Sequence, residues 1–113
     1  APFDPVFACQ ISPAAREITA EALAAAIARQ DESLFILDVR EPWEHLLTPW
    51  SEAALAIPFS QLDTRFDEIP RHAKEIIVVC SVGERSAEAA EKLVSMGFSG
   101  VQHLRHGLRD FLP

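Results

Sequence analysis

A run of four β-branched residues at positions 76–79 leads directly into Cys80, and this segment constrains the fold more than any other. β-Branched side chains favour extended backbone, so the run predicts a strand. Residues 34–39 form a second continuous apolar run, which is typical of a strand buried on both faces. The sequence therefore predicts a sheet whose central strands are covered on both sides.

Weaker patterns between these runs alternate helices with strands. Thr19 can cap a helix over residues 20–29, in which Leu23, Ala26 and Ile27 would share the buried face. This order, with connections too long for tight hairpins, favours a mostly parallel sheet with helices on both faces, an α/β fold. The other predicted elements are a helical turn at 43–46, a strand at 54–57, an amphipathic helix at 60–68 with Leu62, Phe66 and the following Ile69 facing in, a helix at about 86–96, a strand at 101–104 and a turn at 108–111.

Length and composition indicate one globular domain. The chain has 113 residues, of which 49% are hydrophobic, enough for a single compact core. Residues 1–16 contain three prolines and no clear period, so we predict an arm or linker there and a domain over 17–113. No apolar run approaches the roughly 20 residues of a membrane-spanning helix. The start lacks both Met and a secretory-signal pattern, which fits processing or a domain of a longer protein.

Charge and cysteine usage argue against several classes of protein. A formal net charge of −7 and a pI near 5.0 disfavour nucleic acid or an anionic membrane as the main partner. Cys9 and Cys80 form no C-x-x-C pair, which disfavours a disulfide framework and a structural zinc site. His103 and His106 straddle a strand end and a loop, so we expect no metal there. A single working thiol suits the reducing cytoplasm, and we interpret Cys9 as incidental.

The surroundings of Cys80 favour a reactive cysteine. Ligands of open parallel sheets bind beyond the carboxyl ends of the strands, and Cys80 follows the end of its strand. The helix predicted to begin near Ser86 directs free N–H groups and the positive end of its dipole at the intervening loop. Gly83 permits that loop to curl into a nest of N–H groups, and Arg85 adds a positive charge. Together these features favour a thiolate, the form that attacks or carries sulfur.

The alternative interpretation of Cys80 is an ordinary buried cysteine, because free cysteines are often core residues. The reactive interpretation requires the sulfur to lie at the edge of the sheet with loop N–H groups directed at it. A sulfur sealed in the hydrophobic interior, with those N–H groups turned away, would exclude it.

Residues 80–86 resemble the active-site loop of rhodanese-like domains, in which a cysteine opens a six-residue loop that often ends in Arg-Ser. Further segments occur in the family's order. Residues 37–44 resemble its Asp-Val-Arg segment, residues 53–58 its Gly-Ala-x-x-Ile-Pro strand, and residues 97–104 the stretch after its active-site helix. The resemblance covers about residues 17–112, and the shared order of the motifs makes it specific.

The resemblance implies a five-stranded, mostly parallel rhodanese-like sheet and a sulfurtransferase. Cys80 would take sulfane sulfur from thiosulfate or a persulfidated protein, hold it as a persulfide and pass it to a nucleophilic or protein acceptor, without a cofactor. Arg85 would attract an anionic donor. The residues implied in binding the persulfide are Ser81, Val82, Gly83, Glu84 and Arg85, and those implied in structural support are Asp38, Arg40 and Ser86.

Three departures from the family pattern concern the substrate more than the fold. Residues 48–52 replace the common Gly-His-Ile segment, so one wall of the site is expected to differ. Residues 106–111 replace the usual Gly-Gly-x-x-x-Trp. Glu84 lies next to Arg85 and partly cancels its charge, which weakens the case for free thiosulfate as the natural donor.

Two alternatives to sulfur transfer follow from the same residues. Cysteine-dependent phosphatases also wrap an anion in a loop from cysteine to arginine, but their signature encloses five residues. Cys80 and Arg85 enclose four, and a tighter loop suits a sulfur atom better than a phosphate. The second alternative is a non-catalytic docking module with the rhodanese fold. Such modules often lack the loop cysteine, which this chain retains.

The beginning of the chain carries a further resemblance. Residues 4–9 and 16–19 resemble the junction after the adenylating domain of ThiF/MoeB-like proteins. Some of those proteins have a C-terminal rhodanese domain that passes sulfur to a ubiquitin-like sulfur carrier, so the resemblance implies such a carrier as a partner. The junction usually holds paired cysteines, whereas this segment has Cys9 alone.

Overall fold

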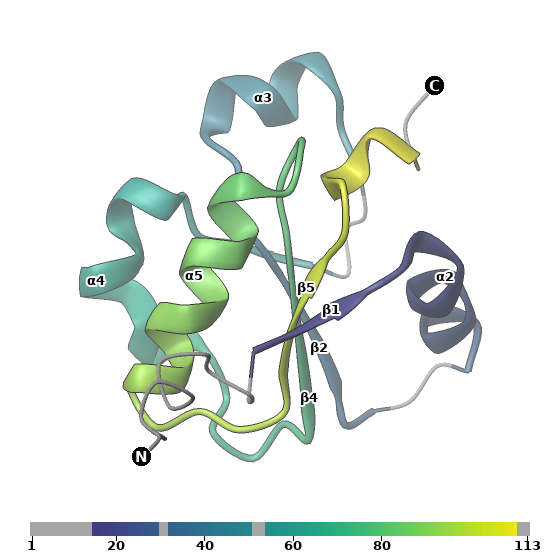
Figure 1. Cartoon of the computed structure of the whole chain (residues 1–113). Helices are drawn as coiled ribbons and strands as arrows, with labels where there is room; N and C mark the ends of the chain where they lie inside the picture. Colours follow the sequence, from purple (N-terminus) through teal and green to yellow (C-terminus); the bar gives the residue numbers. More distant parts are fainter. Residues whose placement is uncertain (1–14, 30–31, 51–53, 111–113) are drawn as a thin grey trace, which may run out of the picture.

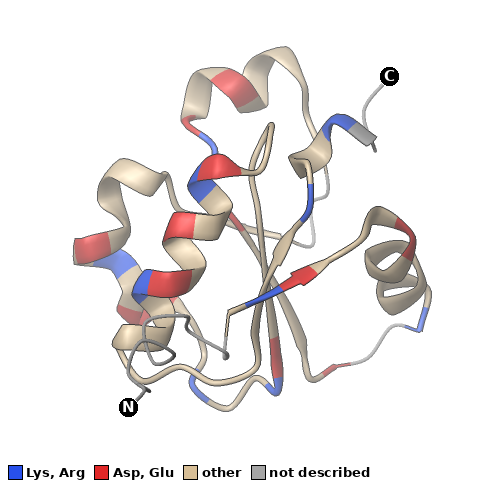
Figure 2. Ribbon diagram, viewed as in Figure 1, with Lys and Arg blue, Asp and Glu red and all other residues tan. Residues whose placement is uncertain are grey.

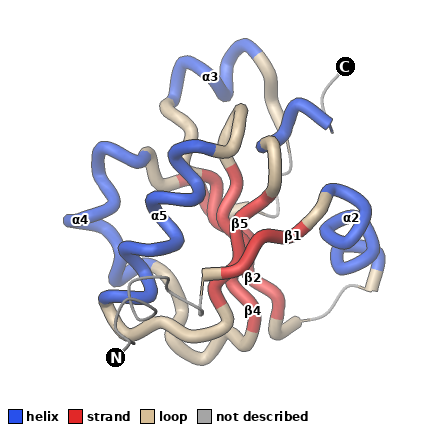
Figure 3. Tube along the Cα trace, in the orientation of Figure 1, coloured by secondary structure: helices blue, strands red, loops and turns tan. Residues whose placement is uncertain are grey.

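A single parallel sheet organises the chain in the computed structural model, which describes residues 15–29, 32–50 and 54–110. Within these residues, five strands run in the order β1-β5-β4-β2-β3, and every neighbouring pair is parallel. Figures 1 and 3 show the strands stacked through the centre of the molecule. The strands are β1 (Arg16–Ile18), β2 (Leu34–Asp38), β3 (Leu55–Ala56), β4 (Glu75–Val79) and β5 (Val101–Leu104).

Helices cover both faces of this sheet. Figure 1 shows α4 and α5 on one side and α2 on the other, while α3 and the C-terminal turn η3 lie beyond the ends of the strands. Among the described residues, no helix is both long enough and apolar enough to cross a membrane. The helices are α2 (Ala20–Ala28), α3 (Pro42–Leu47), α4 (Leu62–Arg65) and α5 (Glu84–Ser95), and the 3₁₀ turns are η1 (Phe59–Gln61), η2 (Phe66–Glu68) and η3 (Gly107–Asp110).

Alternate residues of β4 pack into two separate hydrophobic cores, one on each face of the sheet. Ile76 and Val78 pack in the cluster that includes Leu93 of α5, whereas Ile77 and Val79 pack in the cluster that includes Leu23 of α2. The side chains of these four residues are essentially inaccessible to solvent. A continuous apolar strand is required when both faces are covered. The predicted α/β fold, with a five-stranded parallel sheet and helices on both faces, is therefore confirmed.

The register between β2 and β4 positions the chemistry at one end of the sheet. Asp38 pairs with Val79, and the Val39 N–H donates a hydrogen bond to the Val79 carbonyl at 3.0 Å. The residues that follow β2 therefore lie beside Cys80, which follows β4. This end is also where α3 and η3 lie (Figure 1).

Strand β1 was not predicted. The structure places Arg16, which we predicted to belong to the N-terminal arm, in this strand opposite Gln102 of β5. A three-residue edge strand with two exposed polar residues shows no apolar run or alternation, so local pattern alone does not reveal it. Residues 1–14, including Cys9, lie outside the described residues.

The helix predicted over residues 60–68 was wrong in form. The segment is instead the succession η1, α4 and η2. A backbone hydrogen bond between residues three apart lies at each end of this segment. The Gln61 N–H donates to the Pro58 carbonyl at 2.8 Å, and the Ile69 N–H donates to the Phe66 carbonyl at 3.1 Å. Leu62 and Ile69 are buried as predicted, whereas Phe66 is only partly buried.

The prediction that Ile27 faces the core was also wrong, because its exposed fraction is 38%. Leu23 and Ala26 are the residues of α2 that are buried, so the buried stripe of this helix is narrow. Helix α2 nevertheless begins as predicted, since the Thr19 side chain accepts a hydrogen bond from the Ala22 N–H at 3.2 Å.

The two sides of α2 give a test of this packing. Leu23→Ala, at a residue with 0% exposure, should lower the free energy of unfolding by about 2–4 kcal/mol. Ile27→Ala should cost less than about 1 kcal/mol, because its side chain leaves little cavity behind. Urea unfolding followed by circular dichroism measures both variants, and equal losses would contradict the observed face of α2.

Candidate active site

The sulfur of Cys80 accepts two backbone hydrogen bonds at the carboxyl end of β4. The Gly83 N–H donates to Sγ at 3.0 Å, and the Ser86 N–H donates to it at 3.3 Å. The thiol also lies 3.5 Å from the Ser86 hydroxyl oxygen, to which it can donate. Cys80 has 0% exposure, so its sulfur lies below the protein surface. The site thus combines complete burial with N–H groups that converge on the sulfur.

The loop geometry explains why these N–H groups are available to bond to Sγ. Gly83 has φ +101°, in the left-handed region that a side chain disfavours, and this turn directs its N–H back at Cys80. Helix α5 begins at the next residue, so the Ser86 N–H belongs to its first turn and has no carbonyl partner within the helix. Sγ takes the place of a capping oxygen, where the helix dipole favours negative charge.

A second turn supports the loop from β5. The Leu108 N–H donates to the Cys80 carbonyl at 2.7 Å. Gly107, with φ +70°, lies so close to the loop that a Cβ there would sit 2.4 Å from the Ser81 carbonyl carbon and 2.5 Å from the Val82 nitrogen. The backbone of η3 therefore packs directly against the loop that surrounds the sulfur.

Arg85 makes a bidentate ion pair with Glu44 of α3. Its two terminal nitrogens each lie 2.7 Å from a Glu44 carboxylate oxygen, and the Ser81 hydroxyl donates to the same carboxylate at 2.7 Å. The Arg85 hydrogen bonds, with help from Ser81 and against the cost of burial, lower the pKa of Glu44 to about 2. The same pair raises the pKa of Arg85. The arginine charge is therefore neutralised by a carboxylate from another element.

Glu44 is the site residue that residue-by-residue reasoning missed. It stands in the first turn of α3, after Pro42, and its side chain accepts a hydrogen bond from the Glu41 N–H at 2.8 Å. An acid three residues after the residue that begins a helix is a capping pattern, and that pattern was visible in the sequence. Its pairing with Arg85, 41 positions away, was not visible.

Glu84, which we expected to cancel part of the arginine charge, is exposed, and its side chain forms no hydrogen bond or ion pair with another described residue. The carboxylate that pairs with Arg85 is that of Glu44. Val82, the remaining residue of the predicted binding loop, is half-exposed.

Asp38 and Arg40 form a buried ion pair behind the loop. The Arg40 guanidinium contacts the Asp38 carboxylate at 3.1–3.2 Å and donates to the Thr48 carbonyl at 2.8 Å. Arg40 has 0% exposure, so its charge depends on these partners. The pair ties the end of β2 to the end of α3, the helix that carries Glu44. Neither side chain has a hydrogen bond to Cys80 among those of the described residues, which is the arrangement expected of structural support.

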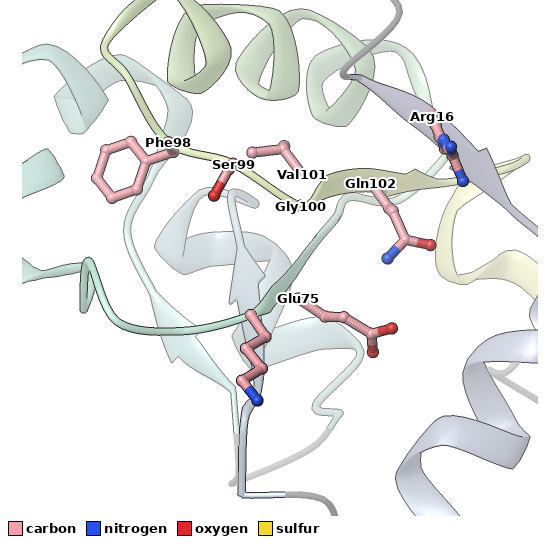
Figure 4. Close-up of a pocket in the computed structure, with 8 residues that line it drawn as sticks. Arg16, Glu75, Phe98, Ser99, Gly100, Val101 and Gln102 are labelled. Atoms are coloured by element: carbon pink, nitrogen blue, oxygen red, sulfur yellow. The ribbon is translucent and has the colours of Figure 1, made fainter.

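Two hollows of the described surface are not lined by Cys80 or by its loop. One of about 500 Å³ is lined by Arg16, Lys74, Glu75, Gln102 and their neighbours, around the beginnings of β4 and β5 (Figure 4). Because Cys80 follows the opposite end of β4, this hollow is not part of the sulfur site. A second, of about 310 Å³, lies between α3, β3 and α4, where Arg40, His45 and Arg65 line it.

Comparison with known proteins defines the class. The model of the rhodanese-like domain family matches residues 19–112, and the chain belongs to that family. A sulfurtransferase of Allochromatium vinosum is 30% identical over 92 residues, which span 81% of this chain and 83% of that protein. YrkF of Bacillus subtilis, whose name proposes a sulfur carrier, is 36% identical over 83 residues, 72% of this chain. The match spans only 43% of YrkF. These relatives support a rhodanese-like, sulfur-related function.

Solved structures agree with this assignment. A rhodanese-related protein of Thermoplasma volcanium matches with a TM-score of 0.74 and 29% identity, over 85% of this chain and 89% of its own. An NAD-dependent persulfide reductase of A. fulgidus is 35% identical with a TM-score of 0.65, over 91% of this chain. That match covers only 17% of the reductase, so the similarity concerns one part of it.

The Glu44–Arg85 pair predicts a pH-dependent stability. The folded-state pKa of Glu44 is lowered from 4.5 to about 2, so the carboxylate stabilises the fold above pH 4.5 and loses this contribution as the pH falls towards 2. Glu44→Gln should therefore cost roughly 1–3 kcal/mol near neutral pH, and the difference from the unmodified protein should shrink in acid. Urea unfolding across this pH range measures it. A difference that is constant with pH would contradict the pair.

The close contact of Gly107 with the sulfur loop predicts that position 107 tolerates no side chain. Gly107→Ala would combine a left-handed φ with a backbone clash, so it should destabilise the protein by at least about 2 kcal/mol and disturb the sulfur loop. Gly97→Ala is the matched control, because Gly97 also has a positive φ, +95°, but a Cβ added there would meet only an arginine side chain at 3.4 Å. Thermal unfolding compares the two, and an equally mild loss in both variants would contradict the close approach.

Proposed function

We propose that this chain is a sulfurtransferase that carries sulfane sulfur as a persulfide on Cys80. The observation that carries the proposal is the pair of N–H groups, from Gly83 and Ser86, directed at Sγ. Such donors stabilise negative charge on sulfur in the thiolate and in the persulfide alike. The sulfurtransferase relative and the match to part of a persulfide reductase support the same chemistry.

The proposed transfer balances without a cofactor. The Cys80 thiolate attacks the outer sulfur of the donor, a new S–S bond forms, and the donor's own bond to that sulfur breaks. The leaving electron pair stays on the donor, which departs as sulfite from thiosulfate or as a thiolate from a persulfide. An acceptor nucleophile then attacks the outer sulfur on Cys80, and the electron pair of the broken S–S bond restores the Cys80 thiolate.

The loop residues have distinct proposed roles. Gly83 and Ser86 hold Sγ, and the remaining amides from Ser81 to Arg85 would hold the outer sulfur, which an S–S bond of about 2.05 Å carries beyond Sγ. Arg85 positions the loop through Glu44, because its charge is already paired. We therefore favour a persulfidated protein over free thiosulfate as the natural donor, although thiosulfate serves as a laboratory donor.

A phosphatase is the weaker candidate for this loop. Phosphate in such a site needs an arginine free to bind its oxygens, and here Glu44 occupies both terminal nitrogens of Arg85. A Rhodopseudomonas palustris protein named as a possible tyrosine phosphatase is 22% identical with a TM-score of 0.76, which shows a shared fold alone. A docking module is disfavoured because Cys80 is present.

Two parts of the proposal concern the cellular setting. We place the protein in the reducing cytoplasm, where a single thiol stays available for sulfur transfer. We also propose a ubiquitin-like sulfur carrier as one acceptor. The residues whose pattern suggests that partner include positions 4–9, which lie outside the described part of the chain.

Intact-protein mass spectrometry tests the persulfide. Incubation with thiosulfate should add one sulfur atom, and cyanide should remove it as thiocyanate. Cys80→Ser should gain none, whereas Cys9→Ser, the matched control, should gain sulfur like the unmodified protein. Sulfur retained in Cys80→Ser would contradict the assignment, as would phosphate release from an aryl phosphate without any thiocyanate from thiosulfate and cyanide.

A further inference from the structure

Large apolar side chains gather on the outer surface around the sulfur loop. The described residues expose five such side chains, and four of them lie on α3 or in the loop itself. The fifth, Ile27, lies on α2. We call the four the apolar rim; they are Trp43 at 62% exposure, Leu46 at 84%, Leu47 at 73% and Val82 at 50%.

Helix α3 has its polarity inverted. Residues spaced by three and four share one face of a helix, so Trp43, Leu46 and Leu47 point the same way, into solvent. The carboxylate of Glu44 is buried instead, bonded to Arg85 and Ser81. A surface helix normally buries its apolar face and exposes its charges. A contiguous exposed apolar face therefore indicates a surface used for contact.

The rim borders the sulfur because α3 is fastened to the loop. The bonds from Ser81 and Arg85 to Glu44 span the gap between the two elements, and Val82 belongs to the loop. Figure 1 shows α3 beside the tip of the loop that joins β4 to α5. An occupant that covered both α3 and Val82 would therefore lie over the loop that holds Cys80.

The other side of the loop carries positive charge. The Leu108 N–H bonds to the Cys80 carbonyl, so η3 flanks the loop opposite α3, and Figure 2 shows basic residues along this stretch. Arg109 is exposed there, and its guanidinium bonds to the His106 carbonyl at 3.1 Å. Within the described part of the chain, Arg109 has no carboxylate partner. Its charge complements an acidic group on whatever covers the rim.

We propose that the apolar rim, together with Arg109, docks a polypeptide donor whose cysteine persulfide is flanked by apolar residues and by an acidic one. This rests on the proposed function and names its partner. A small anion would find Arg85 already paired, whereas a polypeptide can bind the rim and present its sulfur to Cys80. The Cys80 thiolate takes the outer sulfur, the donor's S–S bond breaks, and the donor departs as a thiolate.

Defined persulfides test the docking surface. The probe is a heptapeptide with a central cysteine persulfide, two leucines on each side and a glutamate at each end, compared with N-acetylcysteine persulfide. The rate of sulfur gain on Cys80, followed by intact mass, should be at least about tenfold higher with the peptide. A peptide with serines in place of the leucines should lose this advantage.

Three variants locate the contact. The double variant Leu46→Ser and Leu47→Ser should slow loading from the peptide about tenfold and leave loading from N-acetylcysteine persulfide unchanged. Ile27→Ser, at the exposed apolar residue on α2, is the matched control and should change neither rate. Arg109→Glu should slow loading from the acidic peptide and favour a peptide with lysines at its ends.

The outcomes separate the two proposals. Loading from neither persulfide would defeat the proposed function, and the docking surface with it. Equal loading from both persulfides, or the same loss in the double variant for both, would defeat the docking surface alone. A dimer would defeat the docking surface as well, if sedimentation equilibrium detects it in the unmodified protein and the double variant is a monomer. A second copy of the chain would then cover the rim.

Discussion

Two backbone N–H groups directed at one sulfur atom are the interaction on which the site depends. They converge because β4 ends at Cys80, the chain turns through a left-handed glycine at Gly83, and α5 begins at once. Side chains can be exchanged in evolution, but these donors belong to the backbone and persist while the turn persists. The beginning of the helix needs an acceptor for its free N–H groups, and the Cys80 sulfur is that acceptor.

A chain of buried polar contacts keeps that turn in place. It runs from Asp38 to Arg40, through the end of α3 to Glu44, and from Glu44 to the sulfur loop through Arg85 and Ser81. Each charge in it is paired, as burial requires. One consequence is chemical. Arg85, to which the family resemblance assigns an anionic donor, has both terminal nitrogens bonded to Glu44, and in our proposal recognition of the donor falls to the apolar rim.

Local pattern predicted the elements that are buried on both faces and the glycine-controlled loop, because such segments must be apolar or must turn sharply. Strands β2 and β4 follow the first part of this rule, and the Gly83 loop follows the second. Local pattern failed for elements that depend on residues far away in the sequence. Strand β1 depends on pairing with β5 and on a Glu17–Arg105 contact of 2.8 Å, 88 positions apart. Ile27 was assigned to the core because helical spacing defines a face but not the width of the contact.

The candidate site likewise has parts that local sequence pattern predicts and parts that depend on remote residues. Cys80, Gly83 and Arg85 were proposed from local signals, namely a strand end, a glycine and a helix start, whereas the supporting roles of Asp38 and Arg40 came from the family resemblance. The state of Arg85 depends on Glu44, and the apolar rim depends on which face of α3 is turned outwards. Both are set by three-dimensional packing, so neither could be read from spacing.

Backbone amide chemical shifts test most directly whether the loop holds the transferred sulfur. Proton–nitrogen spectra of the isotopically labelled protein would be recorded before and after thiosulfate adds sulfur to Cys80, with intact mass to verify loading. The amides of the loop from Ser81 to Ser86 should shift most, while the Arg105 amide, which bonds to Ile18 at 2.8 Å, should stay in place. Full loading with all of these loop signals unmoved would contradict the account.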